Sequence, residues 1–138
     1  MDLARRLDIR ESGRVAVVDP PVRFRDDLEP LPPNVEYCSV EEGDLDCIIV
    51  FTKTRADLNA AMIPALTALR ATGTLWVAWP KQLSGYATDV SAEVAQAAGM
   101  RFGLLDTRRI SINDGWTAMR FIVRLDDRES WSKRSFDE

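Results

Sequence analysis

One nine-residue stretch constrains the fold of this chain more than any other: Gly73-Thr74-Leu75-Trp76-Val77-Ala78-Trp79-Pro80-Lys81. Alternate residues of a strand point to opposite faces of its sheet, and here both sets are largely apolar. A strand that is apolar on both faces is typical of a parallel sheet covered by helices. Pro80 has no N–H to donate, so the strand is expected to end there, and Gly73 is expected to close a preceding helix. Trp79 and Lys81 then reach the carboxyl end of a buried strand, where open α/β sheets bind their ligands.

Other apolar runs predict further strands of the same sheet. Three short runs precede the central stretch, and two longer runs follow it as a hairpin, with an Asn113-Asp114-Gly115 turn between them. The predicted strands cover residues 15–18, 35–38, 45–51, 102–112 and 117–125.

One helix is expected before the central strand in the sequence and another after it. Thr54 is expected to cap a helix that continues past Pro64 with a kink, and Thr88 or Asp89 to cap a second helix that closes at Gly99. The predicted fold class is therefore α/β: a three-layer, Rossmann-like, mostly parallel sheet with a C-terminal antiparallel hairpin.

The length of 138 residues suits one domain, expected over residues 1–125, with a charged, flexible tail over residues 126–138. No run approaches the ~18 apolar residues of a membrane span. The amino terminus leads into no apolar signal-peptide core, so we expect a cytoplasmic protein with no membrane partner.

Charge and residue usage exclude several classes of function. The net charge is −4, whereas a general nucleic-acid binder carries a basic surface. The chain has no histidine, which excludes Ser–His and Cys–His triads and removes the commonest metal ligand. Cys38 and Cys47 lack the spacing of a metal or redox motif and are expected to be buried free thiols. No metal site is predicted.

The order of elements over residues 45–125 is similar to the second half of class I S-adenosylmethionine-dependent methyltransferases. A closer resemblance is to a family of small bacterial proteins of uncharacterised function with a trimmed version of that fold. The residues that carry this match are Trp76-Val77-Ala78-Trp79-Pro80-Lys81, Ser84-Gly85, Thr88-Asp89, and Trp116 followed by Phe121. The resemblance implies a methyltransferase-like fold and brings no activity with it.

The chain departs from working methyltransferases at the cofactor loop. Those enzymes follow their first strand with a Gly-x-Gly type loop, whereas this chain has Asp19-Pro20-Pro21, which lacks glycine and two N–H donors. Glu41 or Glu42 stands where an acid could imitate the ribose-binding residue. Thr52 and Lys53 replace the start of the Asp/Asn-Pro-Pro-Tyr motif of amino-methylating enzymes. No cofactor is therefore predicted, and Asp19, Glu41, Thr52 and Lys53 are candidates for a vestigial cofactor site.

A second candidate site lies beside the central strand. In methyltransferase order, the strand of residues 117–125 lies between the central strand and the strand of residues 102–112. That order gathers aromatic and polar side chains on one rim, which suits a small anionic or aromatic ligand. The candidate ligand-binding residues are Trp79, Lys81, Ser84, Thr88, Asp89, Asp114 and Trp116. Ordinary roles compete with this one: Lys81 as a surface ion pair, Thr88 and Asp89 as helix caps, and the tryptophans as core.

Three functional hypotheses follow. The leading one is a non-catalytic, methyltransferase-like domain that binds a small molecule or a protein partner. The second is an S-adenosylmethionine-dependent methyltransferase with an atypical cofactor loop. The third is a structural protein that forms a homodimer through an exposed edge. Against edge pairing, Arg108 and Arg109 alternate with Asp106 in a pattern typical of a solvated edge strand.

Overall fold

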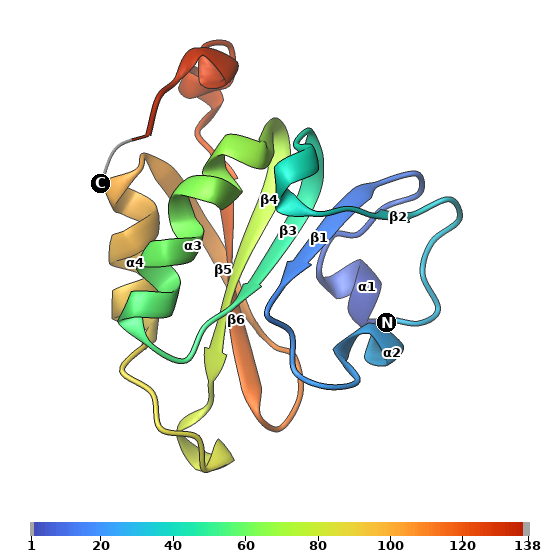
Figure 1. Cartoon of the computed structure of the whole chain (residues 1–138), viewed down its shortest axis with the longest axis vertical. Coiled ribbons are helices and arrows are strands. Elements are labelled where there is room, and N and C mark those ends of the chain that lie inside the picture. Colours follow the sequence, from blue (N-terminus) through green and yellow to red (C-terminus); the bar gives the residue numbers. More distant parts are fainter. Residues whose placement is uncertain (1, 137–138) are drawn as a thin grey trace.

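The computed structural model describes residues 2–136, and six strands form one sheet in the order β2-β1-β3-β4-β6-β5 (Figure 1). β1, β3 and β4 run parallel, β2 pairs in parallel with the start of β1, and β6 is antiparallel to both β4 and β5. The predicted α/β class and the insertion of the last strand between its two predecessors are therefore confirmed. The strands are β1 (Arg14–Val18), β2 (Glu36–Tyr37), β3 (Leu45–Phe51), β4 (Leu69–Pro80), β5 (Leu104–Ser111) and β6 (Trp116–Val123).

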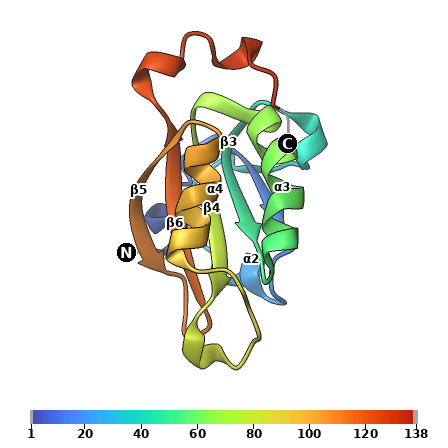
Figure 2. The same ribbon diagram turned by 90° about the vertical axis from the view of Figure 1, so that its left-hand side faces the viewer.

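Helices cover both faces of the sheet (Figure 2). α3 (Arg55–Ala68) and α4 (Ala92–Arg101) cover one face, where Leu75, Val77 and Trp79 of β4 pack into a first hydrophobic core. The short helices α1 (Leu3–Arg6) and α2 (Phe24–Asp27) pack against the other face, in a second core with Trp76 and Ala78. β4 is thus apolar on both faces because it lies between two cores.

The α3 helix begins as the sequence predicts. Thr54 accepts a hydrogen bond from the Asp57 N–H, and the Asp57 carboxylate accepts one from the Thr54 N–H, which together form a capping box. The helix continues through Pro64 to Ala68. Among residues 2–136, no helix has the length and apolar character needed to cross a bilayer.

Three predicted boundaries are wrong. Gly73 lies within β4 and closes no helix, because the chain turns directly from α3 into β4 at Leu69. The α4 cap is Ser91, whose Oγ accepts from the Val94 N–H at 3.2 Å, and not Thr88 or Asp89. Gly99 lies inside α4, where any side chain would overlap the Phe121 ring, so close packing explains this glycine better than a helix end does.

The segment after β6 differs from the loose tail that its charge predicts. Short 3₁₀ turns cover Leu125–Asp127 and Trp131–Lys133, and the chain folds back over the start of β4. Trp131 is buried, and its indole N–H donates to the Leu69 carbonyl at 2.8 Å. The described part of this segment therefore contributes a large side chain to the first core.

This docking predicts that Trp131→Ala destabilises the whole domain. Removing a buried tryptophan costs about 3–5 kcal/mol, and here it also leaves the Leu69 carbonyl without its partner. Leu125→Ala is the control, because Leu125 is 75% exposed. Urea unfolding followed by circular dichroism measures both, and a Trp131→Ala curve that overlays the wild type would show that the segment is not docked.

Candidate functional site

Two hollows meet where β1 and β3 end side by side. From this pair the chain crosses to β2 in one direction and to β4 in the other, which makes the carboxyl ends of β1 and β3 the switch point of the sheet. The hollows have volumes of ≈ 530 Å³ and ≈ 660 Å³, and Asp19 and Asp57 line both. We call the first the aromatic hollow and the second the polar groove.

The aromatic hollow combines ring walls with charged groups. Phe51 and Trp116 meet edge to face with ring centroids 5.1 Å apart, and Tyr86 lies 6.0 Å from Trp116. The Lys53 ammonium lies 4.4 Å from the centre of the Tyr86 ring, within the range of a cation–π contact. The full lining is Asp19, Pro20, Pro21, Val22, Phe51, Lys53, Asp57, Tyr86 and Trp116.

Local hydrogen bonds hold the charged side of this hollow in place. Buried Thr52 donates both its N–H and its hydroxyl to the Ala78 carbonyl, at 2.9 and 2.8 Å. Lys53 follows at once, and its N–H donates to the Asp57 carboxylate at 3.1 Å. Backbone N–H donation from Lys53, with that from Thr54, holds the pKa of Asp57 below its usual value. Asp57 therefore stays ionised at neutral pH.

The loop after β4 positions Tyr86. The Ser84 hydroxyl accepts from the Tyr86 N–H at 3.1 Å, and the Thr88 hydroxyl accepts from the Val90 N–H at 3.0 Å. Asp89 ties the loop to α3, because its carboxylate accepts from the Arg55 N–H at 2.7 Å. These three predicted ligand residues shape the loop, and none of them lines the aromatic hollow.

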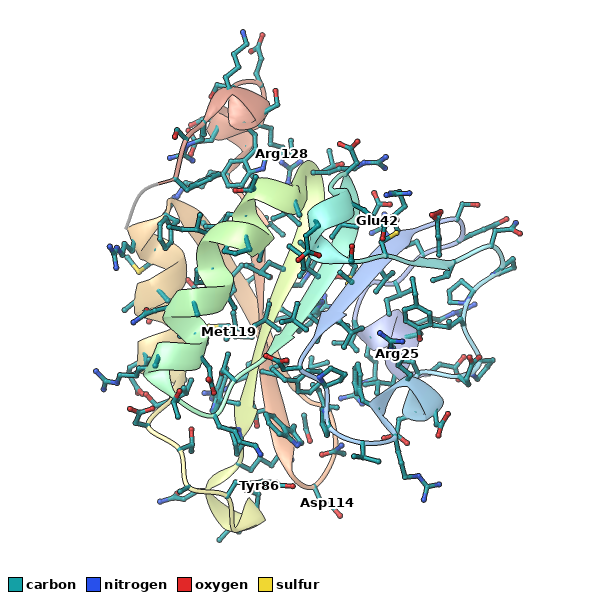
Figure 3. All side chains as sticks on the ribbon, viewed as in Figure 1. Arg25, Glu42, Tyr86, Asp114, Met119 and Arg128 are labelled. Atoms are coloured by element: carbon teal, nitrogen blue, oxygen red, sulfur yellow. The ribbon has the colours of Figure 1, made fainter. Side chains whose placement is uncertain are left out.

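The structure separates the other members of the predicted rim. Trp79 packs into the first core and Trp116 into the second, so the two indoles lie on opposite faces of the sheet. Lys81 donates from its ammonium to the Ser111 hydroxyl at 2.6 Å, away from the hollow. Asp114 is exposed at the hairpin tip (Figure 3). Of the seven rim residues, only Trp116 lines the aromatic hollow.

The polar groove runs along the α3-facing side of β1. Asp19, just after β1, and Glu41, in the 3₁₀ turn Val40–Glu42 before β3, both line it. Two of the four vestigial-site candidates therefore line the same groove. Burial is the main cause that raises the pKa of the Tyr37 hydroxyl and of the Cys38 thiol in this groove, so neither group is ionised at neutral pH.

The loop after β1 does not fit S-adenosylmethionine. Pro20 and Pro21 offer no N–H groups, and Asp19 takes a left-handed backbone conformation with φ 51°. The helix that follows, α2, spans four residues and cannot provide a full amino-terminal turn for a carboxylate. The loop therefore offers fewer backbone donors to the amino-acid part of this cofactor than a glycine-rich loop does.

Comparison with models of protein families shows to which family this chain belongs. A family model described as a protein of unknown function (DUF3052) matches residues 37–125. The chain belongs to the DUF3052 family. The resemblance to a family of uncharacterised function with a methyltransferase-like fold is thus confirmed. Among curated proteins, no sequence matches this DUF3052 chain.

The solved structures similar to the DUF3052 chain include a biosynthetic protein and several methyltransferases. The pyocyanin biosynthetic protein PhzM matches with TM-score 0.59 and 10% identity, over 88% of this chain and 53% of PhzM. Precorrin-6y C5,15-methyltransferase from Geobacter metallireducens matches with TM-score 0.56 and 7% identity, over 88% of this chain and 86% of its own. Magnesium protoporphyrin IX methyltransferase from Synechocystis, solved with bound S-adenosylmethionine, matches with TM-score 0.54 and 8% identity, over 88% of this chain and 74% of the methyltransferase. At such identities the likeness shows the fold alone, and the chain spans about half the length of PhzM.

Of the nine residues that line the aromatic hollow, only Asp19, Lys53 and Trp116 were candidate site residues, and those missed include Phe51, Asp57 and Tyr86. Phe51 lies in the strand predicted over residues 45–51, and Asp57 completes the capping box of α3, so each has a structural role that masks its place in the hollow. Tyr86 had a usable signal, because it is an aromatic residue in an otherwise polar loop after a buried strand, and it is 49% exposed.

The depressed pKa of Asp57 predicts a pH-dependent contribution to stability. Its folded-state pKa lies below the ordinary 3.8, so its stabilising effect is complete above that value and is lost as the pH falls through the folded pKa. Asp57→Asn is therefore expected to be less stable than wild type at pH 7, with the gap closing under strong acid. Chemical unfolding across pH measures this, with Asp114→Asn at the hairpin tip as the control. A gap that stays constant down to pH 2 would exclude the charged capping interaction.

Proposed function

We propose that this DUF3052 domain is a non-catalytic binding module whose ligand is a small aromatic molecule with an anionic group. The observation that carries the proposal is the aromatic hollow, where a lysine ammonium stands beside Tyr86 and Trp116 at the switch point. Hollows of a few hundred Å³ with aromatic walls and few polar groups are typical of small-molecule sites.

The two parts of such a ligand match separate parts of the hollow. Its ring stacks against Tyr86 and the prolines of the β1 loop, which present flat apolar surfaces. Its anionic group pairs with Lys53, whose ammonium has no carboxylate within ion-pair distance among the described residues. The Asp19 carboxylate, which also lines the hollow, favours a ligand that carries a hydrogen-bond donor as well.

The protonation states of the nearby groups support binding without catalysis. A general base works best when its pKa lies near the operating pH, but the pKa of Asp57 is lowered below that of an ordinary carboxyl. The Cys38 thiol in the neighbouring groove has a raised pKa and so is a poor nucleophile. The chain has no histidine.

A methyltransferase remains the second candidate, because Asp19 and Glu41 still line one groove on β1. Calorimetry with S-adenosylmethionine distinguishes the two. We expect no micromolar binding, because Pro20 and Pro21 remove two backbone donors from the loop after β1. Micromolar binding that is abolished by Asp19→Asn would overturn the non-catalytic proposal in favour of the enzyme.

The proposed ligand class predicts a matched pair of lysine variants. A thermal-shift screen of aromatic carboxylates and phosphates should yield hits whose affinity falls about tenfold or more in Lys53→Met, since a charge-assisted hydrogen bond contributes roughly 1.5–3 kcal/mol. Lys81→Met should bind as wild type, because Lys81 contacts Ser111 and lies outside the hollow. Titration calorimetry gives the affinities, with Tyr86→Ala as a second weakening variant. Equal losses in both lysine variants, or in neither, would place the ligand elsewhere.

A further inference from the structure

The outer edge of β5 is the free edge at one end of the sheet, and its sequence is self-complementary. β5 pairs with β6 on one side only, so the backbone groups on its other side lack strand partners among the described residues. When an antiparallel copy lies beside residues 105–110, Leu105 of each copy can face Ile110 of the other, and Asp106 can face Arg109. Apolar side chains then meet apolar ones, and an acidic side chain meets a basic one. Leu105 is 39% exposed, which makes it an apolar side chain at an open edge.

An irregularity in β5 makes this complementarity geometrically consistent. In a regular strand, residues three apart lie on opposite faces, so Asp106 and Arg109 could not face one another in an antiparallel pair. The β5–β6 register shifts by one residue between Asp106 and Arg108, however. Asp106 is paired with Phe121 and Arg109 with Met119, both in the first core, so Asp106 and Arg109 share a face.

The backbone follows the same alternation. The Ile112 N–H donates to the Trp116 carbonyl, so in an antiparallel ladder Ile110 also turns its backbone groups toward β6, whereas Ser111 and Arg109 turn theirs away. The extra residue at Thr107 shifts this alternation, so Asp106 also turns outward. Asp106 of one copy and Arg109 of another can therefore form a hydrogen-bonded pair, with the reverse pair across a two-fold axis.

We propose that two copies of this chain pair antiparallel through β5, with Asp106 opposite Arg109 and Leu105 opposite Ile110, to form one continuous sheet. The two-fold axis passes between Thr107 and Arg108. Arg108 does not obstruct this pairing, because its guanidinium already bonds to Asp8 and to the Arg6 carbonyl over the second face. The Arg6 guanidinium bonds to the Ser111 carbonyl at 2.6 Å, which limits the paired segment to residues 105–110. The charged side chains of β5 thus favour pairing with a second copy of this strand. The sequence pattern alone indicated an edge strand that faces solvent.

A charge swap tests the register. Asp106→Arg and Arg109→Asp each place like charges opposite one another twice in the dimer, and the double variant restores opposite charges. Sedimentation velocity over 1–200 µM should show a wild-type dimer, single variants that dissociate about tenfold or more readily, and a double variant that recovers dimerisation. Arg124→Asp, outside β5, is the control and should dimerise as wild type.

Circular dichroism of each variant shows whether it is folded, because Asp106 also accepts a bond from the Gln96 side chain at 3.3 Å. A folded wild type that stays monomeric at 200 µM would overturn the proposal. So would single variants that dimerise as well as wild type, since the dimer would then use another surface. Ligand binding at the aromatic hollow is a separate measurement, so neither result depends on the proposed function.

Discussion

The burial of β4 between two hydrophobic cores is the constraint on which the rest of the structure depends. Trp76 is fully buried in the second core and donates its indole N–H to the Leu7 carbonyl at 2.9 Å, which fixes the amino-terminal segment against the sheet. Trp79 is buried in the first core beneath α3 and α4. Because alternate residues of one strand serve both layers, β4 cannot shift in register without misplacing both.

β4 also positions residues of the candidate site. Its carbonyl at Ala78 holds Thr52, so the end of β3 and Lys53 are positioned from β4. The loop that follows β4 then returns Tyr86 to the ring of Trp116, which lies in β6 beside the end of β4. The aromatic hollow is therefore assembled from the loop after β1, the end of β3 with the start of α3, the loop after β4 and the start of β6. These four parts are far apart in the sequence.

The sheet was predictable from the sequence because its apolar runs are distinct and their order obeys topological rules. The rim was only partly predictable, since a sequence places Trp79 and Trp116 near the same end of the sheet but does not tell which face each side chain takes. That depends on the β4–β6 register, in which Trp116 pairs with Pro80 and so lies on the face opposite Trp79. Gly99 and Trp131 were missed for a related reason: each is explained by a packing partner distant in the chain, Phe121 or Leu69.

The placement of β6 also determines the order in which the sheet can assemble. β6 follows β5 in the chain, yet it lies between β4 and β5 and forms the hydrogen bonds to both. As the chain leaves the ribosome, β5 consequently has no place in the sheet until β6 has been made. β4 stays an open apolar edge for that interval, and closing it requires contacts between residues 36 to 48 positions apart, from Pro80 with Trp116 to Thr74 with Ile122. The nascent chain is therefore most exposed to misassociation immediately before the hairpin docks.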